Sequence, residues 1–129
     1  MKFKYKRYGD ILRPVISLRI KYRSKTVLCG MLVDSGSDDS LLDESYAEEF
    51  GIDLKKGELR TATGVAGQSV PYYVHIVDIE IGGETYPAEV GFVPRGPVDY
   101  GIAGQKGFFD KFIVKFDLLK EEIELKKNR

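Results

Sequence analysis

The chain has 129 residues, 43% of them hydrophobic, and its 20 basic and 20 acidic side chains give a net charge of zero. This length fits one domain, residues 1–129, whose core needs no metal or disulfide to fold. No stretch of 18 apolar residues predicts a membrane span, and a single cysteine, Cys29, excludes an intrachain disulfide. Because the amino end, MKFKYKRYGD, also has no apolar signal region, we expect a cytoplasmic protein in a reducing compartment.

The charges are unevenly distributed along the chain. Residues 1–26 contain nine Lys or Arg and one acid, whereas residues 34–58 contain nine acids and two lysines. A basic arm can bind nucleic acid. Here the basic residues alternate with apolar ones, which is typical of a solvent-facing strand. We therefore expect no nucleic-acid partner, and we expect this face to be solvated or to meet acidic segments of a neighbouring chain.

In chain order, the first clear strand covers residues 16–22, where apolar and polar residues alternate. The segment RSK, residues 23–25, predicts a turn. Residues 27–33 are almost continuously apolar, which predicts a strand buried on both faces. Cys29 lies within this strand and is expected to be an inert core thiol.

A short helix is predicted after this strand. Leu42, Tyr46 and Phe50 recur at a spacing of four, and Gly51 follows where a helix often ends. Asp43 is a suitable N-cap residue for this helix.

The rest of the chain predicts further strands. Residues 77–81 and 86–92 alternate around Gly82-Gly83, which indicates a hairpin with a tight turn. Residues 112–116 form another strand, and we expect the tail to return as its hairpin partner. Many short strands with one or two short helices predict an all-β, closed barrel-like domain. His75 is the sole histidine, so we expect it to be structural and we expect no metal site and no cofactor.

The segment DSGSDDS, residues 34–40, directly follows the apolar run MLV. It does not fit a calcium-binding EF-hand loop, because Gly36 occupies the third position. Ser35 has no nearby base that would make it a nucleophile. An aspartic peptidase loop remains, in which an aspartate leaves a buried strand at a tight glycine turn.

Two later segments strengthen this interpretation. TATGVAGQSV, residues 61–70, places two glycines at a potential hairpin tip, and YGIAGQKGFFDKF, residues 100–112, contains an apolar pair followed by glycine. With LVDSGSDDSLL, these segments resemble, in order, the catalytic loop, flap and late glycine motif of the retropepsin-like aspartic peptidases, the family of the retroviral proteases and their bacterial relatives. The resemblance covers nearly the whole chain.

The resemblance implies a role for each matching residue. Asp34 would be the catalytic carboxylate, Ser35 would tie two active-site loops together, and Gly36 would offer its backbone to substrate. Ser37 would support the loop, and we expect its hydroxyl to reach the Asp34 carboxylate. The remaining implied positions line the substrate cleft or pack behind the loop: Asp38, Asp39, Gly64, Val65, Ala66 and Gly67 for the first role, and Ile102, Ala103 and Gly104 for the second.

Two residues depart from the family pattern. Gln105 stands where the viral enzymes have an arginine that supports the acidic residue placed here at Asp38. Ala103 is smaller than the aliphatic residue usual at its position. Both departures put the support of the active-site loop in question.

The implied mechanism needs two carboxylates, but the chain contains one Asp-Ser/Thr-Gly sequence. It is also too short for two pepsin-like lobes. We therefore expect a C2 homodimer that joins Asp34 of each chain into one dyad and cuts extended polypeptide. Two alternatives stay open: a binding or dimerisation module of the same fold with little or no proteolysis, and a structural β-domain in which Asp34 merely caps a turn.

Overall fold

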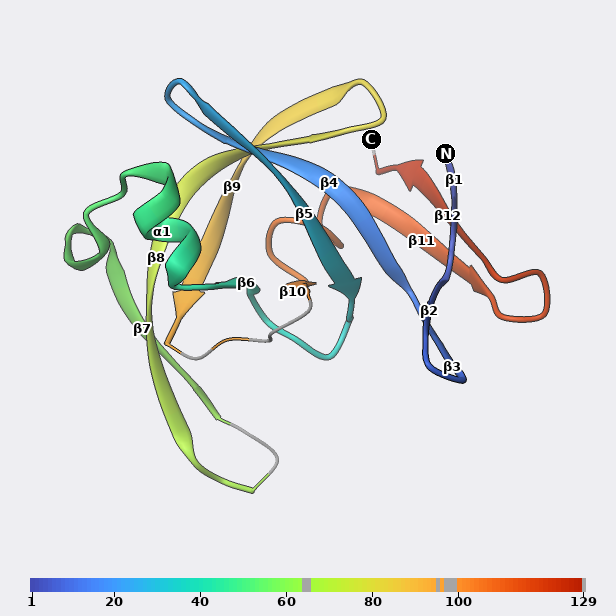
Figure 1. Cartoon of the computed structure of the whole chain (residues 1–129), viewed down its shortest axis with the longest axis horizontal. Helices are drawn as coiled ribbons and strands as arrows, with labels where there is room; N and C mark the ends of the chain where they lie inside the picture. The colour runs from blue at the N-terminus through green and yellow to red at the C-terminus, as the bar shows by residue number, and fades with distance from the viewer. Residues whose placement is uncertain (64–65, 95, 97–99, 129) are drawn as a thin grey trace.

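The computed structural model describes residues 1–63, 66–94, 96 and 100–128, and this part of the chain is built mostly of strands (Figure 1). In chain order, its strands are β1 (Lys2–Lys4), β2 (Lys6–Tyr8), β3 (Ile11–Arg13), β4 (Val15–Tyr22), β5 (Lys25–Val33), β6 (Ser40–Asp43), β7 (Glu58–Thr63), β8 (Ser69–Ile81), β9 (Glu84–Val93), β10 (Gly101–Ala103), β11 (Phe112–Asp117) and β12 (Glu122–Lys127). One α-helix, α1 (Ser45–Phe50), and one 3-10 turn, Leu54–Lys56, complete the described elements. The predicted all-β class with one or two short helices is confirmed.

Seven strands form a sheet that closes on itself. Their order is β4-β5-β10-β6-β9-β8-β7, and β4 also pairs with β8 through Arg19↔Glu80, Ile20↔Ile79 and Lys21↔Asp78. This second pairing turns six of the strands into a ring and leaves β7 attached to β8 outside it. Closure gives the strands of the ring a hydrogen-bonding partner on both sides, which is how barrels avoid exposed edges.

The interior of the ring holds the core. The inward residues of β4, β8 and β9 are buried and alternate with polar or exposed ones, as the sequence predicts. The buried set on these three strands includes Ile16, Leu18, Ile20, Val77, Ile79, Ile81, Ala88, Val90 and Phe92. Burying such side chains stabilises the fold by about 25 cal/mol for each Å² of apolar surface removed from water.

The prediction that residues 27–33 are buried on both faces is wrong. Cys29, Met31 and Val33 are buried, but Leu28 on the opposite face is 63% exposed. The reason is that β5 is a barrel strand, so only one of its faces is directed at the core. A continuous apolar run did not distinguish this case from a strand covered on both sides.

The helix is shorter than predicted and begins later. Leu42 lies in β6, α1 starts at Ser45, and Glu44 rather than Asp43 is the N-cap residue. Asp43 instead accepts a hydrogen bond from the Ser45 amide at 3.0 Å, and hydrogen bonding to the Ser45 side chain and then to its amide lowers the pKa of the Asp43 carboxyl. The predicted end is confirmed, because Gly51 has φ of +75° and donates its N–H to the last turn.

The predicted hairpins are present. β8 and β9 are joined through Ile81↔Glu84, with positive φ at both Gly82 and Gly83, as a tight two-residue turn requires. The tail forms the β11–β12 hairpin, and β1 adds to the other side of β12 to make a three-stranded sheet in the order β1-β12-β11. Both ends of the chain therefore lie in one sheet at the side of the barrel (Figure 1).

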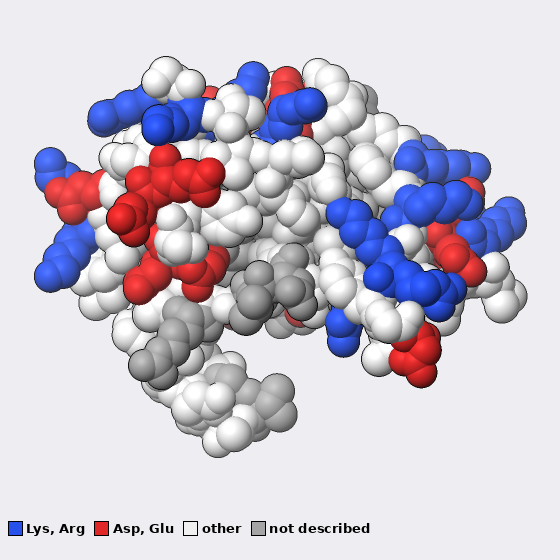
Figure 2. Space-filling model, viewed as in Figure 1, with Lys and Arg blue, Asp and Glu red and all other residues white. Residues whose placement is uncertain are grey.

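The uneven charge of the sequence persists on the surface. Acidic side chains gather on the side of α1, and basic side chains gather on the side of β1, β11 and β12 (Figure 2). No helix among the described residues is long and apolar enough to cross a membrane.

Cys29 provides a test of the core. Its side chain is fully buried, and burial raises the pKa of its thiol to about 12. At pH 8 the native protein should therefore hold almost no thiolate and expose almost no sulfur. We expect a thiol reagent such as DTNB to label it at least 100-fold more slowly than in guanidinium chloride. Equal labelling rates in the two conditions would contradict the placement of Cys29 in the core.

Candidate active site

Asp34 stands at the point where β5 leaves the barrel. It follows Val33, and β10 runs parallel to β5 with Ala103 opposite Val33. The Asp34 amide donates a hydrogen bond to the Ala103 carbonyl at 3.0 Å. The side chain is half-buried, so its carboxylate is anchored on the core but remains accessible.

A tight turn fixes the direction of the Asp34 carboxylate. The Gly36 amide donates to Asp34 Oδ1 at 2.9 Å, and the Ser37 amide donates to the Asp34 carbonyl at 3.3 Å. A Cβ atom on Gly36 would lie 3.2 Å from Asp34 Oδ1, which is closer than most such contacts. Glycine therefore allows the amide to approach the carboxylate.

The second half of the loop is paired with the residues after β10. The Gln105 amide donates to the Ser37 carbonyl at 2.8 Å, and the Lys106 amide donates to the Asp38 carbonyl at 2.9 Å. Ser40 joins both sides, because its hydroxyl donates to the Lys106 carbonyl at 2.8 Å and accepts the Gly104 amide at 3.0 Å. The buried backbone groups of the loop thus have partners, as buried polar groups must.

Gly104 lets the two segments touch. A Cβ atom at this position would lie 2.2 Å from the Asp39 carbonyl oxygen and 2.7 Å from that of Ser37. Both neighbours are backbone atoms that cannot rotate away. The structure therefore brings Ile102, Ala103 and Gly104 against the loop, with Ala103 fully buried.

The Gln105 side chain contacts the loop at Ser35 and not at Asp38, the residue that the viral arginine would support. Its Nε2 donates to the Ser35 carbonyl at 2.9 Å. Asp38 is exposed. The Ser37 hydroxyl donates to the Asp39 carbonyl at 2.7 Å, and not to the Asp34 carboxylate as expected. It therefore stabilises the turn backbone.

Asp39 has partners that the sequence did not suggest. Its side chain is 6% exposed, and one carboxylate oxygen accepts Arg60 Nη1 at 3.0 Å. The other oxygen accepts the Tyr72 hydroxyl. Burial, and then Asp39 itself, raise the pKa of Tyr72, which keeps this hydroxyl a donor. The one sequence signal was an arginine at an inward position of the alternating segment ELRTAT.

The predicted flap is a hairpin of β7 and β8, paired from Glu58↔Val74 to Thr63↔Ser69. It projects away from the barrel (Figures 1 and 2), on the side where the loop between β5 and β6 lies (Figure 1). Ala66 and Gly67 are exposed near its tip, and Gly67 has φ of +85°. Gly64 and Val65 lie outside the described residues.

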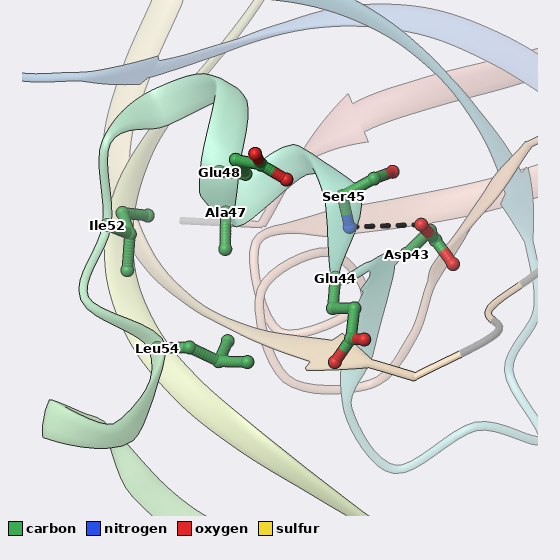
Figure 3. A pocket seen from close by; sticks show the side chains of 7 residues that line it. All are labelled: Asp43, Glu44, Ser45, Ala47, Glu48, Ile52 and Leu54. Atoms are coloured by element: carbon green, nitrogen blue, oxygen red, sulfur yellow. Dashed lines mark hydrogen bonds between the residues drawn. The ribbon is translucent and has the colours of Figure 1, made fainter.

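A separate pocket of about 600 Å³ lies beside α1 and does not include Asp34 (Figure 3). Acidic side chains and an apolar floor line it: Asp43, Glu44, Ser45, Ala47, Glu48, Ile52 and Leu54. Asp43 is structural here, because it also accepts the Gly96 amide at 2.7 Å.

His75 contacts the Leu54 carbonyl through Nε2 at 2.8 Å. Among the described residues no group of three His, Cys, Asp or Glu side chains could hold a metal ion.

Gly104→Ala tests the close contact behind the loop. The added methyl group would overlap two carbonyl oxygens, so we expect a loss of about 3 kcal/mol in the free energy of unfolding by urea. Gly30→Ala is the matched control, because a Cβ atom there meets Val15 at an ordinary 3.4 Å, and it should change stability by less than about 1 kcal/mol. Equal effects of the two substitutions would contradict the described contact.

The comparisons with known proteins agree with this geometry. Residues 18–106 match the sequence model of a family described as aspartyl protease. The fold is similar to a crystal structure of a retropepsin-like aspartic protease from Rickettsia conorii, with a TM-score of 0.62 at 20% identity over 95% of this chain and 97% of that one. It is also similar to the EIAV protease complexed with the inhibitor HBY-793, with a TM-score of 0.55 at 19% identity over 78% and 88% of the two chains.

No curated protein matched the sequence. The family match spans more than half of the chain and includes both the Asp34 loop and the Ile102–Gly104 segment. The resemblance drawn from the sequence is thus confirmed, and the protein belongs to the aspartyl protease family and has the retropepsin-like fold.

Proposed function

We propose that the protein is a homodimeric aspartic endopeptidase whose catalytic dyad is formed by Asp34 of each of two copies. Family and fold support aspartic protease activity in general. The observation that carries the proposal is the Asp34 turn. A half-buried carboxylate is held by the Gly36 amide at 2.9 Å, at the end of a core strand and beside a projecting hairpin.

In the proposed reaction, one Asp34 carboxylate removes a proton from water while the other, protonated, donates a proton to the carbonyl of the scissile peptide. Two carboxylates in contact cannot both remain ionised, so they share a proton and titrate as a pair. In this reaction the role of the surrounding residues is to hold each Asp34 carboxylate in a fixed direction. The Gly36 amide and the contact with Ala103 and Gly104 do so.

The substrate of this proposal is extended polypeptide. A cleft lined by strands would bind extended backbone by strand-like hydrogen bonds. Gly36 and Asp38 are exposed in the loop, and Ala66 and Gly67 are exposed on the hairpin. Their roles toward substrate, and those of Gly64 and Val65, remain predictions. Asp39 was predicted to line the cleft as well, but its carboxylate is already bonded to Arg60 and Tyr72.

The proposed partner is a second copy of the chain. We expect strands from the chain ends, such as residues 2–5 or 123–127, to form the contact. β12 already pairs with β1 on one side and with β11 on the other. A partner strand could therefore extend this sheet only at β1 or β11.

The departures that favoured a binding module are accommodated around the loop. Ala103 is buried and accepts the Asp34 amide, and Gln105 bonds the Ser35 carbonyl. The loop is therefore held without the viral arginine, so these departures do not argue against an enzyme.

Asp34→Asn tests the catalytic assignment. The amide cannot accept the proton of water, so we expect at least a 1,000-fold loss of kcat/KM on a peptide library read by mass spectrometry, with thermal stability unchanged or higher because like-charge repulsion is removed. Thermal stabilisation by an aspartic peptidase inhibitor should vanish in the same variant. Cleavage by folded Asp34→Asn at a tenth of the parent rate would remove Asp34 from the mechanism.

Dilution tests the shared site. If each chain supplies one carboxylate, the monomer has no dyad, and activity per milligram should fall as the dimer dissociates. Sedimentation measured over the same concentrations gives the dissociation constant independently. Constant specific activity far below that constant would show that one chain suffices.

A further inference from the structure

The Asp39 carboxylate is the most buried charge near the catalytic loop. It lies five residues after Asp34, is 6% exposed and accepts Arg60 Nη1 at 3.0 Å and the Tyr72 hydroxyl. A buried carboxylate is costly to the fold unless charged or polar donors surround it. These two donors offset that cost.

Both donors come from the same rung of the projecting hairpin. Arg60 of β7 and Tyr72 of β8 are directly paired in register, so their side chains extend from the same face of the hairpin. The part of the hairpin beyond this pair runs to its exposed tip. One carboxylate in the catalytic loop is thus held by both strands at the base of the hairpin.

Arg60 is itself fixed by further contacts. Its Nη2 atom lies 2.8 Å from Glu58 Oε1 and 2.8 Å from Glu89 Oε1, and its side chain is 20% exposed. The guanidinium therefore bonds the loop through Nη1 and both β7 and β9 through Nη2. A planar group with several donors can do this, whereas a lysine ammonium cannot reproduce the same fork.

We propose that Asp39, which is hydrogen-bonded to Arg60 and Tyr72, is a positioning residue that fixes the position of the hairpin relative to the Asp34 loop. The inference rests on the proposed peptidase function for its kinetic consequence. Substrate would lie between the hairpin and Asp34, so a change in their relative position alters how substrate binds. The contact acts through these two segments and touches no reacting atom.

A merely stabilising role makes a different prediction. A variant that only loses stability lowers the fraction of folded enzyme, which reduces the apparent kcat and leaves KM unchanged. A variant that loosens the hairpin against the loop raises KM in the folded enzyme. It also makes the amides of both segments exchange faster with solvent.

The test uses Arg60→Met, Arg60→Lys and Tyr72→Phe, with Lys127→Met as the control. Lys127 forms an exposed ion pair with Glu84 at 2.6 Å, so its substitution removes one cation far from the loop. Each variant is measured for thermal unfolding, for kcat and KM on a cleaved peptide, and for hydrogen exchange at residues 37–40, 61–63 and 69–73.

We expect Arg60→Met to raise KM by about 10- to 100-fold, the loss typical of a charge-assisted hydrogen bond. Arg60→Lys should recover part of this loss. Tyr72→Phe keeps the ion pair and should raise KM by about fivefold. This milder variant still tests the proposal if Arg60→Met does not fold. Exchange should increase in the loop and the hairpin together, and Lys127→Met should change neither KM nor exchange.

The proposal is overturned if kcat falls at constant KM in the folded variants, or if exchange increases in the hairpin and not in the loop. If the parent protein cleaves no peptide, the proposed function fails. The exchange measurements then still decide whether Asp39 joins the two segments.

Discussion

The contact between the Asp34 loop and the Ala103–Gly104 segment is the constraint on which the rest of the site depends. The Asp34 amide bonds the Ala103 carbonyl, and one residue later the backbone passes so close to Asp39 and Ser37 that only glycine fits. This passage gives the loop its backbone partners. It also places β10 parallel to β5, so that one end of the barrel core carries the carboxylate.

The closed barrel makes that contact rigid. The strand that delivers Asp34, β5, pairs with β4 on one side and with β10 on the other, so it cannot slide without breaking two ladders. β4 in turn pairs with β8. The hairpin of β7 and β8 is an extension of the same β8 strand. The barrel, the loop and the hairpin therefore share one continuous hydrogen-bonded framework, and Asp39 adds a side-chain link across it.

Local patterns in the sequence predicted most strands, because alternation of apolar residues and a Gly-Gly turn depend on neighbours a few residues apart. They misplaced the start of α1, since an Asp43 side chain can bond nearby amides in a turn as well as at a cap. The exposure of Leu28 depends on barrel closure, which no local window contains. The pairing of Asp39 with Arg60 joins residues 21 positions apart and follows from the register of β7 in the sheet.

The distribution of charge constrains how two copies could share a site. In a twofold interface the same surface faces itself, so a patch of one sign placed on the axis would repel its copy. Figure 2 shows acidic side chains gathered beside α1 and basic ones gathered beside the terminal sheet, with some side chains of the opposite sign near each group. In Figure 1 the loop between β5 and β6 lies between these two sides. A twofold axis through the loop that exchanges these two sides would set the acidic side of each copy opposite the basic side of the other. For the proposed dimer, an axis of this direction would both join the two Asp34 carboxylates and bring surface charges of opposite sign together.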